Sequence, residues 1–230
     1  VRLCTERTRI GRNLKVLAVG DGIGSDSIRL ASAGFDVDYM DYEASVTSSV
    51  AAENFRKFKS AAPSSIGNLR VLNRHEIETG TYDAVISLEV IEHVEKPNEF
   101  LGFLHQQLAA DGLLFLSDCF PGITDYWQTH LLSNERLSGF VPLMAAQAGL
   151  AYVGASQQPL CKPYVFQKST ASKDELLMQV LSEPEVMEVL LYEQKKLVKQ
   201  RARKIDKLIY NFKRLAINVR GYLARRRLAV

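Results

Sequence analysis

The residues best suited to chemistry form a glycine-rich loop near the start of the chain. The loop Val19-Gly20-Asp21-Gly22-Ile23-Gly24 follows a short apolar run, residues 14–19, and precedes a helical pattern at residues 25–33. Glycine permits a tight turn and lets a ligand approach the backbone, and the N-terminus of the next helix offers N–H groups to a negative group. The spacing is G-x-G-x-G rather than the G-x-G-x-x-G of dinucleotide binders, and the loop lacks the Lys and Ser/Thr of a P-loop. It therefore argues against ATP hydrolysis.

A carboxylate follows the next predicted strand. Asp41 lies 21 positions after Gly20, where it can accept hydrogen bonds from both hydroxyls of a ribose. Together with the loop, it predicts a cofactor that contains a nucleoside. Two alternatives stay open: an ordinary tight turn with an unrelated surface Asp, and a nicotinamide-dependent enzyme, which the glycine spacing opposes.

Apolar runs and helical patterns alternate over residues 1–168. This alternation is typical of an α/β fold in which a mostly parallel sheet has helices on both faces. We predict strands at 14–19, 35–40, 69–72, 82–88, 112–117, 151–155 and 164–167, and helices at 25–33, 44–59, 98–110 and 134–148.

Four later segments match one superfamily in order and spacing. They are Tyr82-Asp83-Ala84-Val85-Ile86-Ser87-Leu88-Glu89, the adjoining Glu89-Val90-Ile91-Glu92-His93-Val94, residues 108–116, and residues 130–150. With the glycine loop, they resemble the class I S-adenosylmethionine-dependent methyltransferases, in particular ubiquinone-biosynthesis-type O-methyltransferases. The resemblance covers about residues 12–168. It implies a Rossmann-like methyltransferase fold with a seven-stranded, mostly parallel sheet, and S-adenosyl-L-methionine as the cofactor.

The resemblance also assigns roles to individual positions. The glycine loop would pass under the methionine part of the cofactor, Asp41 would bind the ribose, and Tyr42 would lie beside the adenine. The stretch 73–77, with His75, would flank the adenine edge, and Ser87 and Leu88 would lie near the sulfur. The cofactor-binding set is Val19, Gly20, Asp21, Gly22, Gly24, Asp41, Tyr42, His75, Ser87 and Leu88.

One position departs from the family pattern. The family usually has Asp or Glu where this chain has Ala18, and that acid helps to hold the amino group of the cofactor. Asp21 is a substitute within the loop. The departure also supports an alternative, a degenerate, non-catalytic domain that serves in assembly.

Methyl transfer to an oxygen or nitrogen atom can require a base that removes a proton. We name His93 and His130 as catalytic candidates, with Glu89 as a weaker one. The plainer interpretation is that Glu92 and His93 form the first turn of a helix and stabilise the loop. The acceptor that we expect is a small molecule or a glycan, with O-methylation as the reaction. The aromatic segment 125–130 is expected either to line the acceptor pocket or to pack a connecting loop.

A metal site is the other interpretation of this region. The spacing of Glu89, Glu92 and His93 resembles a metal site in small-RNA 2′-O-methyltransferases. Metal-free relatives carry the same string, and the sequence offers no evident fourth ligand. We therefore expect no metal.

Composition sets the class of protein. The chain has 230 residues, 47% hydrophobic and 24% charged, which is ordinary for a soluble globular protein. The three cysteines, Cys4, Cys119 and Cys161, form no C-x-x-C pair, so neither a zinc ribbon nor a redox dithiol is indicated. No signal-peptide pattern is present, and we expect a cytoplasmic protein. The first residue is Val1 rather than methionine, which is compatible with a piece of a longer chain.

The C-terminal part differs in charge and pattern. Residues 195–230 contain thirteen Lys and Arg and one acid, a net charge of +12, so the remaining residues carry −9. Ser182-Glu183-Pro184-Glu185 predicts a capping box, and we divide the chain into a methyltransferase domain, 1–168, and a basic helical extension, 169–230. The extension then shows a heptad-like seam of apolar residues, a pattern typical of a coiled coil, with one charged interruption at Arg201. The seam positions are Val198, Arg201, Ile205, Leu208, Phe212, Leu215, Val219 and Tyr222.

Three partners compete for this helix. A homo-oligomeric or inter-domain packing contact is favoured because the seam is regular and long. An anionic membrane surface is second, which would suit a lipid or quinone O-methyltransferase bound peripherally at the inner face of a membrane. Nucleic acid is third, because the acidic body would repel it.

Overall fold

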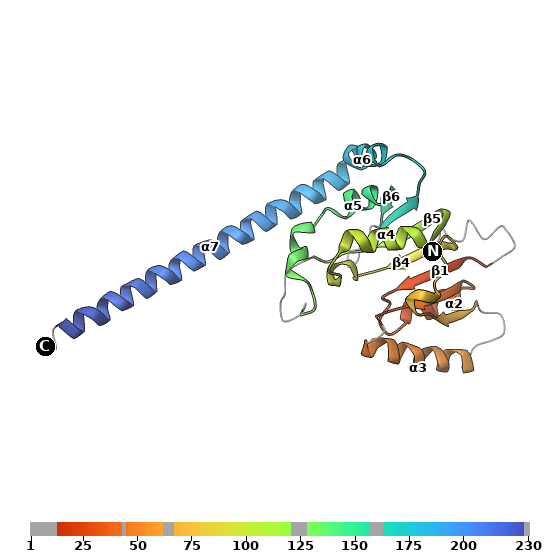
Figure 1. Cartoon of the computed structure of the whole chain (residues 1–230), viewed down its shortest axis with the longest axis horizontal. Coiled ribbons are helices and arrows are strands. Elements are labelled where there is room, and N and C mark those ends of the chain that lie inside the picture. Colours follow the sequence, from red (N-terminus) through yellow and green to blue (C-terminus); the bar gives the residue numbers. More distant parts are fainter. Residues whose placement is uncertain (1–12, 43–44, 62–66, 121–127, 157–162, 228–230) are drawn as a thin grey trace.

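One seven-stranded sheet forms the centre of the molecule (Figure 1). The computed structural model describes residues 13–42, 45–61, 67–120, 128–156 and 163–227, with side chains up to residue 210. The strand order is β3-β2-β1-β4-β5-β7-β6, and β7 is antiparallel to its neighbours while the other pairings are parallel. This confirms the expected fold. The strands are Lys15–Val19 (β1), Asp36–Met40 (β2), Leu69–Val71 (β3), Tyr82–Ser87 (β4), Leu108–Leu116 (β5), Leu150–Ala155 (β6) and Tyr164–Lys168 (β7).

Helices and short 3-10 turns connect these strands. Glycines at the end of β1 and before the second strand delimit the first helix, and Pro97 opens α4 at its first turn, where its missing N–H costs no hydrogen bond. The elements are α2 (Ser25–Ser32), α3 (Val46–Ala61), η2 (Arg74–Glu76), η3 (Ile91–His93), α4 (Pro97–Gln107), η4 (Leu132–Leu137), α5 (Val141–Gln147), α6 (Lys173–Ser182) and α7 (Pro184–Arg227).

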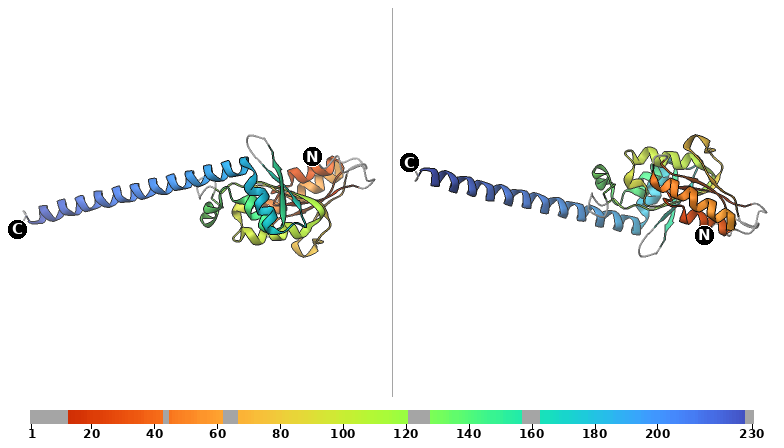
Figure 2. Two further views of the ribbon diagram at one scale, coloured as in Figure 1. Left: turned by 90° about the horizontal axis from the view of Figure 1, so that it is seen from above. Right: turned by 90° about the horizontal axis from the view of Figure 1, so that it is seen from below.

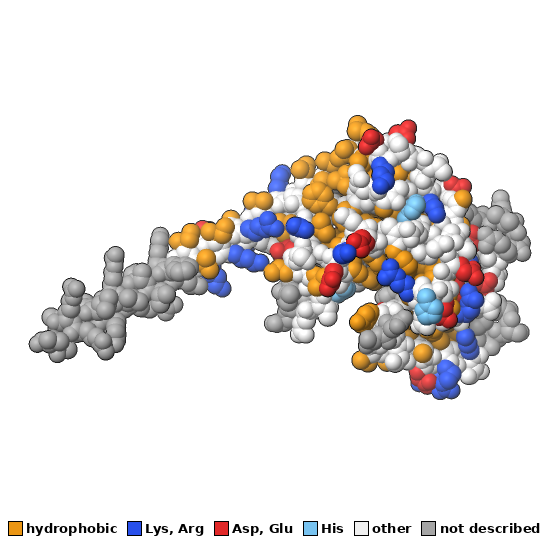
Figure 3. All heavy atoms as spheres, in the orientation of Figure 1, with side chains coloured by type: hydrophobic (Ala, Val, Ile, Leu, Met, Phe, Trp, Pro, Cys, Tyr) orange, Lys and Arg blue, Asp and Glu red, His pale blue; other side chains and the backbone are white. Residues whose placement is uncertain are grey.

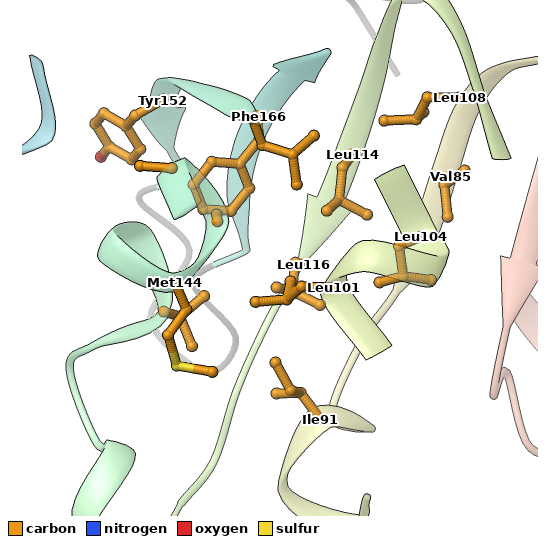
Figure 4. Packing of buried hydrophobic residues seen from close by; sticks show 14 of the residues in the cluster. Val85, Ile91, Leu101, Leu104, Leu108, Leu114, Leu116, Met144, Tyr152 and Phe166 are labelled. Atoms are coloured by element: carbon orange, nitrogen blue, oxygen red, sulfur yellow. The ribbon is translucent and has the colours of Figure 1, made fainter. Parts of the chain in front are cut away.

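Alternating side chains of β1 divide the core into two layers. Val16 and Ala18 belong to a buried cluster with Phe55 of α3, whereas Leu17 and Val19 belong to the cluster on the opposite face. Successive residues of a strand point to opposite faces of a sheet, so both faces of β1 are covered by helices. Figure 4 shows the second cluster, in which side chains of α4 gather beside β5 and β7.

A buried carboxylate links the strands around β1. Asp38 in β2 accepts hydrogen bonds from the Arg70 guanidinium at 2.7 and 2.8 Å and from the Tyr82 hydroxyl at 2.9 Å. The ammonium of Lys15 lies 3.9 Å from the same carboxylate. A buried charge is costly unless it is paired and hydrogen-bonded, so these contacts favour the observed pairing of β3, β2, β1 and β4.

Two predicted helix boundaries are wrong. The helix expected at 134–148 is interrupted between η4 and α5 by Gly139, which has φ 82°. A Cβ atom at Gly139 would lie 3.0 Å from Cα of Leu190, so glycine lets α7 approach there. The helix expected at 98–110 ends at Gln107, because Leu108 already pairs with Tyr82 as the start of β5.

The predicted cap of the long helix is also wrong. Ser182 is the last residue of α6 and donates its hydroxyl hydrogen bond to the carbonyl of Gln179 at 2.6 Å. The capping box of this region instead lies at Ser172 and Glu175, at the start of α6. The sequence analysis missed α6 because residues 169–181 lack a sharp apolar periodicity.

Helix α7 begins on the body and then extends away from it (Figures 1 and 2). Val186, Leu190 and Leu197 are buried against the body, whereas Val198 and Ile205 are 67% and 58% exposed. The space-filling view shows hydrophobic and basic side chains together along the described part of this helix (Figure 3). The division at residue 168 stays a prediction. Among the described residues, no helix is both long and apolar enough to cross a bilayer.

We predict that the first turns of α7 stabilise the body. Leu190 is 8% exposed and its neighbour Leu191 is 52% exposed. Leu190→Ala should lower the free energy of unfolding by about 2–3 kcal/mol, because it removes buried apolar contacts and leaves a cavity. Leu191→Ala, the matched control, should change it by less than about 0.5 kcal/mol. Urea unfolding monitored by circular dichroism measures both, and equal effects would contradict this packing.

Candidate active site

The strand order creates a crevice beside the end of β1. Because β1 lies between β2 and β4, the connections after β1 and β4 leave the sheet toward opposite faces, which is where open α/β sheets bind ligands. A cavity of about 340 Å³ lies there. Its lining residues are Ala18, Val19, Gly20, Asp21, Gly22, Asp26, Leu30, Ile86, Leu88 and Glu89.

The three glycines of the loop have different roles. All have positive φ, of 73° at Gly20, 54° at Gly22 and 82° at Gly24. The N–H of Gly20 donates to the carbonyl of Met40 at 2.8 Å, which ties the loop to β2. A Cβ atom on Gly22 would meet no atom within 4 Å, whereas one on Gly24 would collide with the Phe55 ring. Gly22 therefore keeps space open for a ligand, and Gly24 serves the packing of α3.

Asp21 caps the helix that follows the loop. Its carboxylate accepts hydrogen bonds from the backbone N–H groups of Asp26 at 3.2 Å and Ser27 at 2.7 Å. Partial burial raises the pKa of this carboxyl despite those hydrogen bonds. The residue expected to substitute for the missing acid at Ala18 is thus also engaged in holding α2.

Asp41 and Tyr42 lie directly after β2. The hydroxyl of Tyr39 lies 3.0 Å from the Asp41 carboxylate and 2.7 Å from the carbonyl oxygen of Gly22. The Asp41 carboxylate also accepts a hydrogen bond from the backbone N–H of Tyr42. Tyr39 thereby holds the glycine loop and Asp41 side by side. Tyr42 is 76% exposed, so its ring is accessible at the rim.

The residue expected at the adenine edge, His75, lies at the protein surface on η2. The Arg74 guanidinium lies 4.8 Å from the centre of the Phe103 ring. Met40, Arg74, Val94, Phe100 and Phe103 help to line a separate cavity of about 240 Å³.

The end of β4 brings one predicted residue, Leu88, to the crevice, whereas the other, Ser87, does not line it. Ser87 is fully buried and its hydroxyl has no hydrogen-bond partner among the described residues. Glu89 follows with φ 54°, a conformation that is uncommon for residues other than glycine. Its N–H donates to the Ser117 hydroxyl at 3.0 Å, and that hydroxyl donates to its carboxylate at 2.7 Å.

The two predicted catalytic histidines meet at a buried carboxylate. The Nε2 atoms of His93 and His130 each lie 3.9 Å from Oε1 of Glu92, and the ring centres are 4.8 Å apart. Asn134 donates to the carbonyls of Glu92 and Val94, which fixes the two segments against each other. The sequence could not place His130 beside His93, because they lie 37 positions apart.

This trio could hold a divalent cation. The potential ligand atoms of Glu92, His93 and His130 lie within 4.8 Å of one another. Glu89, which the sequence pattern added to the trio, is tied to Ser117 instead. The expectation of no metal stays a prediction, but His130 supplies a nearby ligand that the sequence did not reveal.

Acidic groups also line a cavity between the end of β5 and α7. Its volume is about 470 Å³, and burial together with the charges of Glu89 and Glu193 raises the pKa of Asp118 to about 7. Of the aromatic segment, residues 125–127 lie outside the described residues. The lining residues are Asp118, Cys119, Phe120, Glu135, Ser138, Gly139, Tyr164, Val189, Glu193, Lys196, Leu197 and Gln200.

These features define an α/β domain with a ligand-sized crevice at the strand-order reversal. A family model described as a methyltransferase domain matches residues 2–148, so the chain belongs to the methyltransferase domain family. The mitochondrial ubiquinone biosynthesis O-methyltransferase of Schizosaccharomyces pombe is 34% identical over 107 residues, which is 45% of this chain and 37% of that protein. The match thus spans little more than a third of this relative.

Solved structures share the fold. The magnesium protoporphyrin IX methyltransferase of Synechocystis PCC 6803, solved with bound S-adenosylmethionine, is 18% identical, with a TM-score of 0.50 over 73% of this chain and 76% of that chain. An O-methyltransferase family protein from Burkholderia thailandensis is 14% identical, with a TM-score of 0.52 over 74% and 56%.

The crevice fits the cofactor that the family implies, S-adenosyl-L-methionine. The open space at Gly22 admits a ligand against the backbone, and Asp21, Asp26 and Glu89 give the cavity a negative lining. A negative lining suits the sulfonium and ammonium groups of this cofactor.

We predict that two glycine substitutions separate binding from stability. Gly24→Ala should lower the free energy of unfolding by about 2 kcal/mol or more, because its methyl group collides with Phe55 and its φ is positive. Gly22→Ala should cost less stability but weaken binding of S-adenosylhomocysteine at least about tenfold, because the methyl group enters open space at the crevice. Thermal melts and calorimetric titration measure the two effects, and the reverse ranking would contradict these roles.

We predict that the buried carboxyl group of Glu92 makes the free energy of unfolding depend on pH. Burial raises its pKa from 4.5 to about 8, so between these values the folded chain keeps a proton that the unfolded chain loses. Stability therefore falls as the pH rises through this window. The melting temperature of Glu92→Gln relative to wild type should rise between about pH 5 and pH 8 in metal-free buffer. Exposed Glu99→Gln is the control, and a constant difference for Glu92→Gln would contradict the shift.

Proposed function

We propose that the chain is an active S-adenosylmethionine-dependent methyltransferase that methylates a hydroxyl group of a small-molecule or glycan acceptor. The observation that carries the proposal is the acid-lined crevice around the Gly20–Gly22 backbone at the strand-order reversal. Bound S-adenosylmethionine supplies an electrophilic methyl group. The protein then has to align the acceptor with it and exclude water.

We further propose that the acceptor binds in the cavity between β5 and α7. Ser117, which holds Glu89 at the cofactor crevice, directly precedes Asp118 at this second cavity. A volume of about 470 Å³ is in the range that holds one small ligand. Phe120 and Tyr164 belong to the lining, and aromatic side chains can pack on an aromatic or sugar ring.

The charges of this cavity favour a neutral acceptor. Asp118, Glu135 and Glu193 line it, with Lys196 as the described cation. An anionic acceptor would meet like charges there. The hydroxyl groups of a sugar or of a phenol can donate hydrogen bonds to these carboxyl groups, or accept one from a carboxyl group that is protonated, without that repulsion.

Two sets of groups are candidates for removing the proton of the acceptor. Asp118 has a pKa of about 7, which suits a general base near neutral pH, and it lines the cavity. His93 and His130 remain the candidates named from the sequence, but their Nε2 atoms face Glu92. We favour Asp118 for proton removal and assign the histidines to holding the adjacent loop.

The distal part of α7 is proposed to pair with a second copy of the chain. Val198, Ile205 and Leu208 are 67%, 58% and 59% exposed, and their spacing follows the seam predicted from the sequence. The dense positive charge supports an anionic membrane surface as the second candidate. Sedimentation with and without residues 199–230, together with flotation on anionic vesicles, separates the two.

We predict that α7 determines acceptor use. Val189 lines the cavity and is 44% exposed, so Val189→Trp can fill the cavity without disturbing the core. It should lower kcat/KM at least about tenfold for catechol and phenyl β-glucoside, two neutral probes, in tritium transfer from S-adenosylmethionine. Leu191→Trp, on an exposed part of the same helix that does not line the cavity, should leave kcat/KM unchanged.

Binding of S-adenosylhomocysteine should be the same in wild type and both variants. Equal kcat/KM in Val189→Trp and wild type would contradict the position of the acceptor. Absence of transfer to either probe, or faster transfer to their carboxylated analogues, would contradict the acceptor class. Failure of wild type to bind S-adenosylmethionine would favour the degenerate domain that Ala18 suggests, and preferential binding of NAD would favour a nicotinamide enzyme.

A further inference from the structure

The charge balance of the cofactor crevice presents a specific problem. The amino-acid end of S-adenosylmethionine carries an ammonium group, and its sulfonium lies next to it. Cations that leave water for a cavity need a carboxylate nearby. At the end of β1 the chain provides Ala18, which has no charge to offer, so another group of the cavity has to supply it.

All three carboxylates in the cavity have other contacts, and those of Asp21 and Asp26 limit what these two offer a cation. Asp21 accepts two backbone hydrogen bonds at the start of α2. Asp26 lies 3.5 Å from the Arg29 guanidinium, and its side chain is 47% exposed. Water screens such an exposed pair, so Asp26 contributes little field inside the crevice.

Glu89 is held by Ser117 through both its backbone N–H and its carboxylate. Its φ of 54° places the residue in the left-handed region, which is unfavourable for a long side chain and is tolerated where neighbours enforce it. Ser117, 2% exposed, enforces it by accepting the N–H of Glu89 and donating to its carboxylate. The conformation keeps Glu89 in the lining of the crevice, together with Gly20 and Leu88.

We infer that Glu89 is the carboxylate that balances the positive charge at the amino-acid end of the cofactor, in the place of the acid missing at Ala18. Ser117 is its positioning residue. This inference rests on the proposed function, since it concerns the same cofactor. It assigns Glu89 to cofactor binding, a different role from the catalytic base or metal ligand considered from the sequence.

Calorimetric titration with two probes tests this assignment. S-adenosylhomocysteine carries the ammonium group, and 5′-methylthioadenosine lacks the whole amino-acid end. Glu89→Gln should weaken binding of S-adenosylhomocysteine at least about tenfold and leave binding of 5′-methylthioadenosine unchanged. Glu188→Gln, which removes the same charge from an exposed position on α7, is the control and should change neither affinity.

Two further variants keep the test decisive. Ala18→Asp added to Glu89→Gln should recover part of the lost affinity, because it returns a carboxylate to the same cavity. Ser117→Ala should weaken binding of S-adenosylhomocysteine and leave binding of 5′-methylthioadenosine unchanged. This variant replaces Glu89→Gln in the test if melting curves show that Glu89→Gln does not fold.

The outcomes distinguish the inference from the proposed function. Equal affinity of wild type and Glu89→Gln for S-adenosylhomocysteine would overturn the inference and leave the function intact. An equal loss of affinity for both probes would also overturn the inference. A loss of methyl transfer with unchanged binding of both probes would overturn it too, and would mark Glu89 as a base. No binding of either probe by the folded wild type would overturn the proposed function itself.

Discussion

The pairing of β1 with both β2 and β4 is the constraint on which the site depends. This pairing places the strand-order reversal of the sheet beside β1. The loop after β1 and the loop after β4 therefore face each other across a crevice. The N–H of Gly20 completes the arrangement by donating to the carbonyl of Met40, which keeps the loop next to Asp41. Without this pairing, the glycine loop would not lie in the lining of a crevice with the end of β4.

Concentrated negative charge is the second feature of the site. Burial and then the charge of Glu89 raise the pKa values of Glu92 and Asp118, and the charge of Asp118 adds to the shift of Glu92. Such an arrangement lowers the stability of the fold, because like charges repel and burial disfavours ionisation. Perturbed carboxyl groups of this kind are typical of sites that bind cations or transfer protons. They extend from the crevice toward the cavity between β5 and α7, so the two cavities share one acidic region.

Local sequence patterns were sufficient for the sheet and for the position of the glycine loop beside Asp41. Glycine spacing and the position of Asp41 record short-range geometry, and apolar runs such as 82–87 mark buried strands directly. Contacts between distant segments were beyond this reasoning. The proximity of His130 to Glu92, the clamp of Ser117 on Glu89 and the packing of Leu190 beside Gly139 depend on how loops and helices meet in space. Ser182 shows a related limit, since its cap pattern fits a helix start, but the preceding helix uses its hydroxyl.

The central claim is that the crevice between the Gly20–Gly22 loop and Glu89 binds S-adenosylmethionine. A structure of the chain crystallised with S-adenosylhomocysteine tests it most directly. The account predicts the ribose hydroxyls at the Asp41 carboxylate and the thioether between Gly20 and Leu88. The nucleoside bound elsewhere, or the crevice closed by side chains in the presence of saturating ligand, would contradict it.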